Sequence, residues 1–356
     1  MRVLWDGVRF MGYRYIGSKS RIANDIIRYL GAPQTEDGYF IDAFSGTGIV
    51  ASNAADFGWK IIINDIMYNA TVMSEARLLS KEDVTFSALG GYEAVLEILR
   101  QTTREGFIWR EYSPTSFQQV GVERKYFTED NAKKIDGAIE KIHYYRNNGT
   151  ISEQEFSLLV ATLISAVNNV ANIAGTYGCF LSKWTAQSLG MLNLKPLQVR
   201  DKKVDYLVTA KDVFSIESSP NDVVYLDPPY TKRQYASYYH ILETIALGDE
   251  PIVGGVAGLR PWKSKASVFC YKTKALQALV NLASSQSANR VLISYSDDGH
   301  IQLNQLVEEL KKTGTVEVVD LGSIGRYRPN SIASLHKPVV KEYLIDYKHD
   351  RRARNE

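Results

Sequence analysis

Val-Val-Tyr-Leu-Asp-Pro-Pro-Tyr, residues 223–230, decides the fold of this chain. The apolar run before the aspartate predicts a buried strand, and the prolines end it because proline cannot donate to a sheet ladder. Asp227 therefore follows the carboxyl end of a strand, the edge of an open α/β sheet where ligands bind. Pro228 and Pro229 offer carbonyls without amides, and Tyr230 adds an aromatic face. This loop suits a flat heterocycle with an exocyclic amine; the alternative is a strand-ending turn with an incidental aspartate.

Length, charge and cysteine usage narrow the class of protein. The chain has 356 residues, 45% of them hydrophobic, enough for one large domain with an insertion or for two domains. Its 42 basic and 40 acidic residues exclude a histone-like binder but allow a nucleic-acid enzyme with a locally basic cleft. Cys179 and Cys270 lack partner histidines at ligand spacing, so we expect neither a disulfide scaffold nor a metal site. Without a bilayer-spanning stretch or a signal peptide, a cytoplasmic protein is expected.

A glycine turn follows an earlier strand. Residues 40–48, Phe-Ile-Asp-Ala-Phe-Ser-Gly-Thr-Gly, predict a strand that enters a turn and then a helix. Gly46 and Gly48 let the backbone approach a ligand closely. The next buried strand, 60–64, ends at Asp65, and an acid at that position can accept hydrogen bonds from both ribose hydroxyls of a nucleoside. The pattern indicates a nucleoside-containing cofactor.

The kind of cofactor stays open on these residues alone. Residues 46–51 satisfy the Gly-x-Gly-x-x-Gly/Ala dinucleotide pattern, and Asp65 lies near the expected offset of about 20 residues. A nicotinamide cofactor is therefore one interpretation. Asp42, with Phe44 beside it, argues against it, since an acid in the first turn repels a pyrophosphate but suits the ammonium group of an amino-acid moiety.

A basic segment precedes the first predicted helix. Arg-Tyr-Ile-Gly-Ser-Lys, residues 14–19, leads into apolar residues at helical spacing. The backbone amides around Gly17 and the amine of Lys19 would face an approaching carboxylate or phosphate. The alternative is an ordinary capped surface helix with a solvated lysine.

From about residue 70 to about residue 205 the alternation of strand and helix is lost. Thr128 is a candidate helix cap, and Ser152 with Glu155 forms a capping box before an apolar helical stripe. Glycines, aromatics and a lysine are mixed over 175–184, which is typical of a nucleic-acid contact surface and also of a packed loop. A second basic and aromatic loop follows the tetrad. The candidate nucleic-acid contacts are Lys183, Trp184, Lys232, Arg233 and Tyr235.

The strand and helix alternation resumes at residue 204. A strand over 204–209 precedes Asp212, which is placed to meet the edge of a cofactor's base. Further strands are expected over 290–296, 315–321 and 339–347.

The order of these motifs resembles the Dam-type group of DNA adenine-N6 methyltransferases, over residues 14–75 and roughly 205–347. The resemblance implies an α/β fold: a Rossmann-like methyltransferase sheet with helices on both faces, a C-terminal antiparallel strand pair, and an inserted, mostly helical target-recognition domain. The implied catalytic domain comprises 11–75 and 201–348, with the insertion at 76–200.

The resemblance also implies residue roles. S-adenosylmethionine would be held by Tyr15, Lys19, Asp42, Phe44, Gly46, Gly48, Asp65, Asp212 and Asp227. The target base would be held by Asp227, Pro228, Pro229 and Tyr230. Tyr15 stands where the similar proteins carry tryptophan, so a ring is kept for stacking. The implied partner is double-stranded DNA, for a monomer or dimer that either works beside a cognate restriction endonuclease or is solitary.

The chemistry agrees with these roles. An adenine amine is a poor nucleophile because its lone pair is conjugated with the ring, and acceptors on its hydrogens draw the lone pair out of conjugation. Asp227 and the Pro228 carbonyl are two such acceptors, and the base must be flipped out of the duplex to reach them. Cytosine-N4 or RNA-adenine methylation uses the same logic, although serine at position 227 would favour the former. A nicotinamide-dependent dehydrogenase would leave the tetrad without a role.

Overall fold

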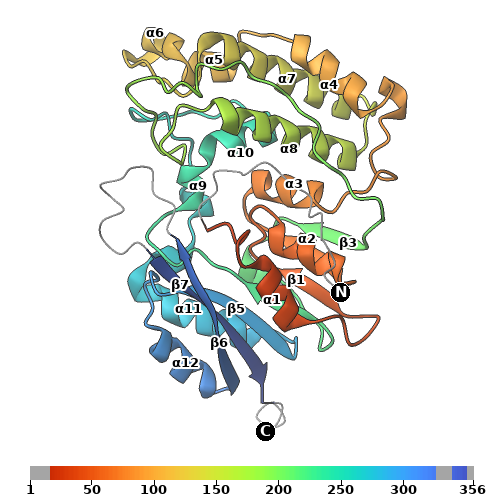
Figure 1. Ribbon diagram of the computed structural model, residues 1–356. Helices are drawn as coiled ribbons and strands as arrows, with labels where there is room; N and C mark the ends of the chain where they lie inside the picture. Colours follow the sequence, from red (N-terminus) through yellow and green to blue (C-terminus); the bar gives the residue numbers. More distant parts are fainter. Residues whose placement is uncertain (1–16, 326–338, 351–356) are drawn as a thin grey trace. The chain divides into compact units, whose positions relative to one another are not determined.

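The computed structural model describes residues 17–325 and 339–350, which form two compact units (Figure 1). The sheet unit comprises Gly17–Ser74, Val204–Tyr235 and the described residues from Lys265 onward. The helical unit comprises Glu75–Lys203 and Ala236–Ser264. Residues 236–264, which the sequence analysis placed with the second catalytic segment, thus group with the inserted helices.

The sheet unit is built on seven described strands in the order β3-β2-β1-β4-β5-β7-β6. The first five are parallel, and β7 lies antiparallel between β5 and β6. This arrangement confirms the predicted Rossmann-like sheet and its C-terminal antiparallel pair. The strands are β1 Tyr39–Asp42, β2 Lys60–Asn64, β3 Tyr206–Thr209, β4 Val223–Leu226, β5 Arg290–Ser296, β6 Gly314–Gly325 and β7 Val339–His349.

Helices cover both faces of this sheet. Ile41 and Val224 point to the face on which α11 and α12 bury their apolar residues. On the opposite face the Arg290 guanidinium lies 5.3 Å from the ring centroid of Tyr29 in α1. The helices of this unit are α1 Ala23–Leu30, α2 Ile49–Asp56, most of α3 Tyr68–Ala76, α11 Lys272–Ser285 and α12 Leu303–Lys311.

Strand register brings the predicted site residues to one edge. Asp42, the last residue of β1, pairs with Tyr225 in β4, two residues before Asp227. Because β7 runs in the opposite direction, its beginning lies at the same edge, where Glu342 pairs with Ser296 at the end of β5. The carboxyl ends of the parallel strands and the start of β7 therefore border the same space.

The helical unit follows the predicted local signals. The Thr128 hydroxyl accepts a hydrogen bond from the Asn131 amide at the start of α7, and Ser152 with Glu155 forms the expected capping box of α8. Across the described ranges, no helix is long and apolar enough to cross a membrane. The helices of the helical unit are α4 Tyr92–Gln101, α5 Phe107–Tyr112, α6 Phe117–Val120, α7 Glu129–Asn147, α8 Glu153–Val170, α9 Tyr235–Tyr238 from its second residue, and α10 His240–Leu247.

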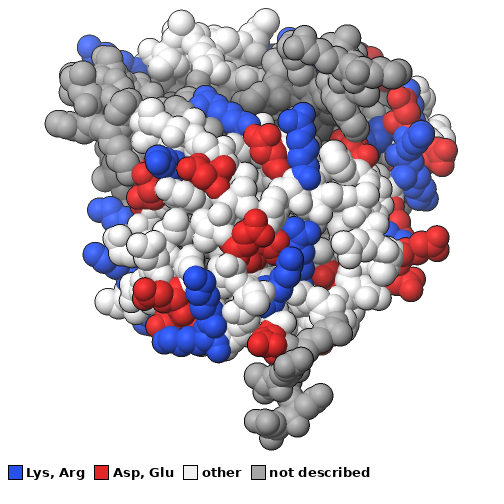
Figure 2. Space-filling view, turned by 60° about the horizontal axis from the view of Figure 1, so that its bottom comes forward, with Lys and Arg blue, Asp and Glu red and all other residues white. Residues whose placement is uncertain are grey.

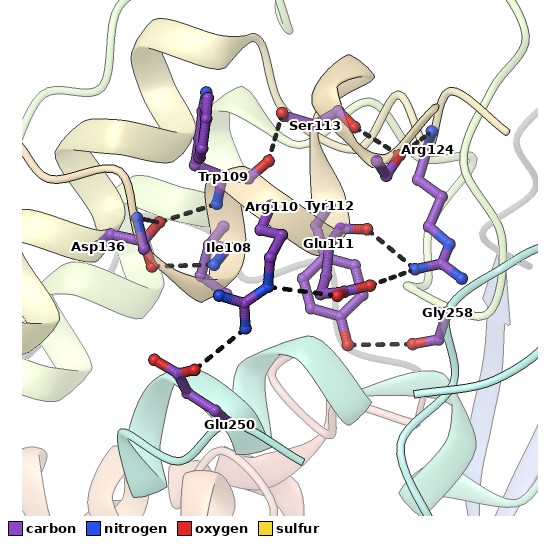
Figure 3. A network of polar contacts seen from close by, with 12 residues as sticks. Ile108, Trp109, Arg110, Glu111, Tyr112, Ser113, Arg124, Asp136, Glu250 and Gly258 are labelled. Carbon is purple, nitrogen blue, oxygen red and sulfur yellow. Dashed lines mark hydrogen bonds and ion pairs between the residues drawn. The ribbon is translucent and has the colours of Figure 1, made fainter. Parts of the chain in front are cut away.

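A buried arginine ties the loop after α10 to the rest of the helical unit (Figure 3). The Arg124 side chain is only 1% exposed, and its Nη1 lies 2.7 Å from the Glu111 carboxylate. The same guanidinium donates to the backbone carbonyl of Gly255, and the Tyr112 hydroxyl donates to that of Gly258. Hydrogen bonds from buried donors therefore fix this loop, which explains why residues 236–264 belong to the helical unit.

Candidate active site

Asp227 lies at the carboxyl end of β4, as predicted, and a lysine faces it. Lys19 Nζ is 3.1 Å from Asp227 Oδ1, and it donates a hydrogen bond of 2.7 Å to the Tyr230 hydroxyl. The backbone carbonyl of Lys19 accepts from the amides of Ile22 and Ala23 just before and at the start of α1, which fixes the segment that carries the ammonium group. Lys19 is 4% exposed, so the alternative of a solvated surface lysine is wrong.

A second carboxylate faces the same ammonium group. Glu342 Oε2 is 3.5 Å from Lys19 Nζ, and both side chains are buried. Burial lowers the pKa of Lys19, but Asp227, Tyr230 and Glu342 together outweigh it and hold that pKa well above 10.5. Lys19 is therefore a permanent cation. Asp227 keeps a raised pKa because its burial outweighs the attraction of Lys19.

Asp42 adds a third acid at this edge. Its side chain is 2% exposed, and Oδ1 has no hydrogen-bond partner among the described residues. Burial, followed by the charges of Asp227 and Asp65, raises the pKa of Asp42 to about 8. A buried acceptor without a donor costs free energy unless a ligand satisfies it. The site therefore suits a ligand with a positive charge or a strong donor.

Asp65 holds the glycine turn. Its two carboxylate oxygens accept from the amides of Gly46 at 3.1 Å and Met67 at 2.9 Å. Gly46 and Gly48 have φ of 52° and 73°, in the left-handed region that favours glycine. A Cβ at Gly48 would lie 2.6 Å from the Cα of Ser74, which leaves no room for a side chain. A carboxylate has about four acceptor positions, so each oxygen of Asp65 can accept more than one hydrogen bond.

An aromatic group lies beside the remaining predicted cofactor residues. Phe44 meets Phe269 edge-on with ring centroids 5.5 Å apart, and Phe214 stacks on Phe269 at 5.9 Å. Phe214 is 50% exposed, and the Asp212 side chain accepts from its amide at the turn after β3. The structure thus gives Asp212 a capping contact, and its predicted contact with a cofactor base stays a prediction.

The candidate DNA contacts fall into two groups. Lys183 and Trp184 belong to the helical unit, whereas the loop of Lys232, Arg233 and Tyr235 belongs to the sheet unit. Both lysines and Arg233 are exposed. Acidic and basic side chains alternate over the face shown in Figure 2, as the near-neutral composition leads one to expect. Their roles stay predictions.

The structure locates the other predicted residues as follows. Pro228 and Pro229 continue the loop between Asp227 and Tyr230, whose ring meets Tyr295 edge-on at 5.3 Å. Tyr15 lies outside the described residues. Within those residues no group of three or more histidine, cysteine, aspartate or glutamate side chains is arranged to hold a metal ion.

Sequence reasoning missed Glu342, Phe214 and Phe269. A usable signal existed for Glu342, because it stands between the buried Val340 and Leu344 in a strand whose side chains alternate between two faces. An acid on the inward face of such a strand requires a partner. Phe269 gave no signal, since it lies in a short 3₁₀ turn, Val268–Cys270, without periodicity.

The sheet, its acidic glycine turn and the tetrad at one edge define a methyltransferase of the Rossmann-like α/β class. Residues 15–309 match the family model of D12 class N6 adenine-specific DNA methyltransferases, and the chain belongs to this family.

Curated relatives agree with the family. The chain is 35% identical to the type II methyltransferase M.FokI of Planomicrobium okeanokoites, over 85% of this chain and 47% of the relative. It is 33% identical to the modification methylase LlaI of Lactococcus lactis subsp. lactis, over 86% of this chain and 50% of the relative. The type II methyltransferase M.NlaIII of Neisseria lactamica is 30% identical over 86% of this chain and 90% of its own length. The chain spans about half the length of the first two.

Proposed function

We propose that this protein transfers a methyl group from S-adenosylmethionine to the N6 amine of an adenine flipped out of duplex DNA. The observation that carries the proposal is the buried cluster at the sheet edge, in which Lys19 fixes both Asp227 and Tyr230. Asp227 and Tyr230 are the acceptor and the aromatic face that the sequence assigned to the base. Their shared cation holds them in one arrangement before any ligand arrives.

The residues at this edge fit S-adenosylmethionine. The Oδ1 of Asp42, which has no partner among residues 17–325 and 339–350, suits a cationic ligand, and the turn at Gly46 and Gly48 lets the backbone approach closely. The Asp65 carboxylate is an acceptor that suits ribose hydroxyls, while Phe44 and its aromatic neighbours suit an adenine ring. When bound, this cofactor supplies an activated methyl group on a sulfonium. Asp212 completes the proposed set, together with Tyr15 on the sequence argument alone.

Asp227 acts on the amine by accepting its hydrogen bond. A carboxylate of ordinary pKa near 3.9 is far too weak a base to deprotonate a neutral aromatic amine. Its function is therefore orientation of the lone pair and stabilisation of the positive charge that develops on nitrogen. The Pro228 carbonyl supplies a second acceptor, Pro229 restricts the loop backbone, and Tyr230 stacks on the flipped base. After transfer the nitrogen loses one proton, for which the Asp227 carboxylate is an acceptor.

Lys19 takes a different role from the one expected. The sequence assigned its ammonium to the cofactor, whereas among the described residues it contacts Asp227, Tyr230 and Glu342. We therefore assign Lys19 to positioning of the base-binding residues.

The family match favours adenine N6 over cytosine N4, which the same acceptor arrangement could also serve. It gives a nicotinamide-dependent dehydrogenase no support. The relatives' names include modification methylase and type II methyltransferase, so we place this chain in a restriction-modification system in the cytoplasm, acting on double-stranded DNA as a monomer or dimer beside a separate nuclease.

Sequencing of DNA from cells that express the chain, with detection of methylated adenine, tests this proposal. We expect N6-methyladenine at one short sequence motif and none in cells that express Asp227→Ala. Methylation of cytosine, or of RNA alone, would overturn the assignment.

A further inference from the structure

The buried cluster around Lys19 contains more acid than base. Asp227 and Glu342 both face the ammonium group of Lys19, at 3.1 and 3.5 Å. Apart from this ammonium group, Glu342 Oε2 has no polar partner among the described residues. A charge held this way, buried and only partly compensated, is costly to keep. Packing alone gives no reason for an acid at a strand position between Val340 and Leu344.

We propose that Glu342 is a positioning residue for Asp227: it shares the Lys19 ammonium and so leaves part of the negative charge of Asp227 uncompensated for the amine of the target base. This inference rests on the proposed function. Its physical basis is that an ammonium group paired with one carboxylate neutralises that carboxylate, whereas one held between two carboxylates neutralises neither completely.

The geometry supports this division of charge. Lys19 contacts Asp227 through Oδ1, and its shortest contact, 2.7 Å, is to the neutral Tyr230 hydroxyl. The ammonium is thus drawn toward Tyr230 and Glu342 as well as toward Asp227. Without Glu342, we expect it to move fully onto Asp227. The carboxylate would then stabilise a developing positive charge on the amine less well.

Ionisation of Glu342 provides a specific readout. Burial raises the pKa of Glu342 to about 7, with Lys19 opposing that rise and the charges of Asp227 and Asp297 adding to it. The charge of Asp227 also acts on four other titratable groups near it besides Glu342, namely Lys19, Asp42, Tyr225 and Tyr230. Since the pKa of Glu342 is raised, its charge is present above pH 7 and lost below it. Activity that depends on this charge should therefore rise with pH through about 7.

The test compares Glu342→Gln, Glu342→Asp and wild type, with Glu308→Gln, an exposed acid on α12, as the matched control. The quantity is kcat/KM for duplex DNA from pH 5.5 to 9, since that ratio reports ionisations of the free enzyme. One pKa unit of lost carboxylate interaction corresponds to about a tenfold effect. We expect Glu342→Gln to match wild type at pH 5.5, to fall about tenfold below it at pH 9, and to lack the rise near pH 7.

Glu342→Asp keeps the charge and should restore the rise, and Glu308→Gln should retain the wild-type profile. Thermal melting of each variant separates this role from a structural one. A Glu342→Gln protein whose kcat/KM is lowered equally at every pH, in step with its melting temperature, would overturn the inference. So would wild-type kcat/KM at pH 9. If wild type itself methylates no adenine, the proposed function fails and not this inference alone.

Discussion

Lys19 in the sheet unit and Arg124 in the helical unit are both buried cations, 4% and 1% exposed. Arg124 faces one carboxylate, Glu111, and directs its other hydrogen bonds to backbone carbonyls. Lys19 faces two carboxylates, and a third acid at this edge, Asp42, has an Oδ1 without a partner in the described part of the chain. The first cluster is balanced in charge and closed. The second has surplus acid and an unsatisfied acceptor, which is the condition expected where a cationic ligand or a developing charge completes the site.

The largest expected effect is on the balanced cluster. Arg124→Met leaves the Glu111 carboxylate with only its more distant contact to Arg110, at 3.5 Å, and removes the donors to the loop carbonyls. Breaking a buried pair in this way costs about 3–5 kcal/mol of the free energy of unfolding. Urea unfolding followed by tryptophan fluorescence measures it. The double variant with Glu111→Gln should recover part of the loss, and an unchanged urea midpoint in Arg124→Met would show that this cluster is not structural.

Asp227→Ala tests the other cluster. It removes an acceptor that strengthens as charge develops, so single-turnover methyl transfer should fall about 10²- to 10³-fold. DNA affinity should change far less, because the effect lies in the transition state. Asp227→Asn keeps an acceptor oxygen without the charge and should fall between wild type and Ala. Transfer at the wild-type rate by the Ala variant would make the tetrad a simple turn.

Asp65→Ala probes the glycine turn beside the same edge. The change removes acceptors for the proposed ribose hydroxyls and for the Gly46 amide. A hydrogen bond to a charged group is worth about 1.5–3 kcal/mol, so we expect S-adenosylmethionine affinity to weaken by that amount for each bond lost. Calorimetric titration of the folded variant measures this, with the exposed Asp25→Ala as control. Unchanged affinity would remove Asp65 from the cofactor site.

Substitutions of Tyr230 should give the smallest effects. They separate the contribution of its aromatic ring from that of its hydroxyl. Tyr230→Ala loses the ring, and about 1–3 kcal/mol of base stacking should disappear from DNA affinity or transfer. Tyr230→Phe keeps the ring but removes the hydroxyl that accepts from Lys19, which still has two carboxylates to contact. Its expected cost is about 0.5–1.5 kcal/mol. Equal losses in the two variants, measured as single-turnover rates, would argue that the ring does not stack on the base.

The sequence predicts those features of the fold and site that depend on residues close together in the chain. Asp42, Asp65 and Asp227 were found because each ends or follows an apolar run, so position along the chain alone places them at the sheet edge. The capping box at Ser152 and Glu155 was readable for the same reason.

The sequence did not predict contacts between segments that lie far apart in the chain. Lys19 was expected to face a ligand, and its burial against Asp227 depends on a contact between residues far apart in the chain. Glu342 reaches the site only because β7 is antiparallel and its first residues lie beside the last residues of β5. Composition within 236–264 gave no sign that the Arg124 cluster would draw this segment to the helical unit.

The place of β7 in the sheet has a consequence for synthesis. The strand lies between β5 and β6 in space but follows both in the chain, so these two have no partner on their facing edges until residues 339–349 have left the ribosome. Glu342 arrives with the same segment. A nascent chain that already carries the whole tetrad and glycine turn therefore still lacks the second carboxylate that faces Lys19. The acidic cluster around Lys19 is therefore complete only after this strand has been synthesised and has paired with β5.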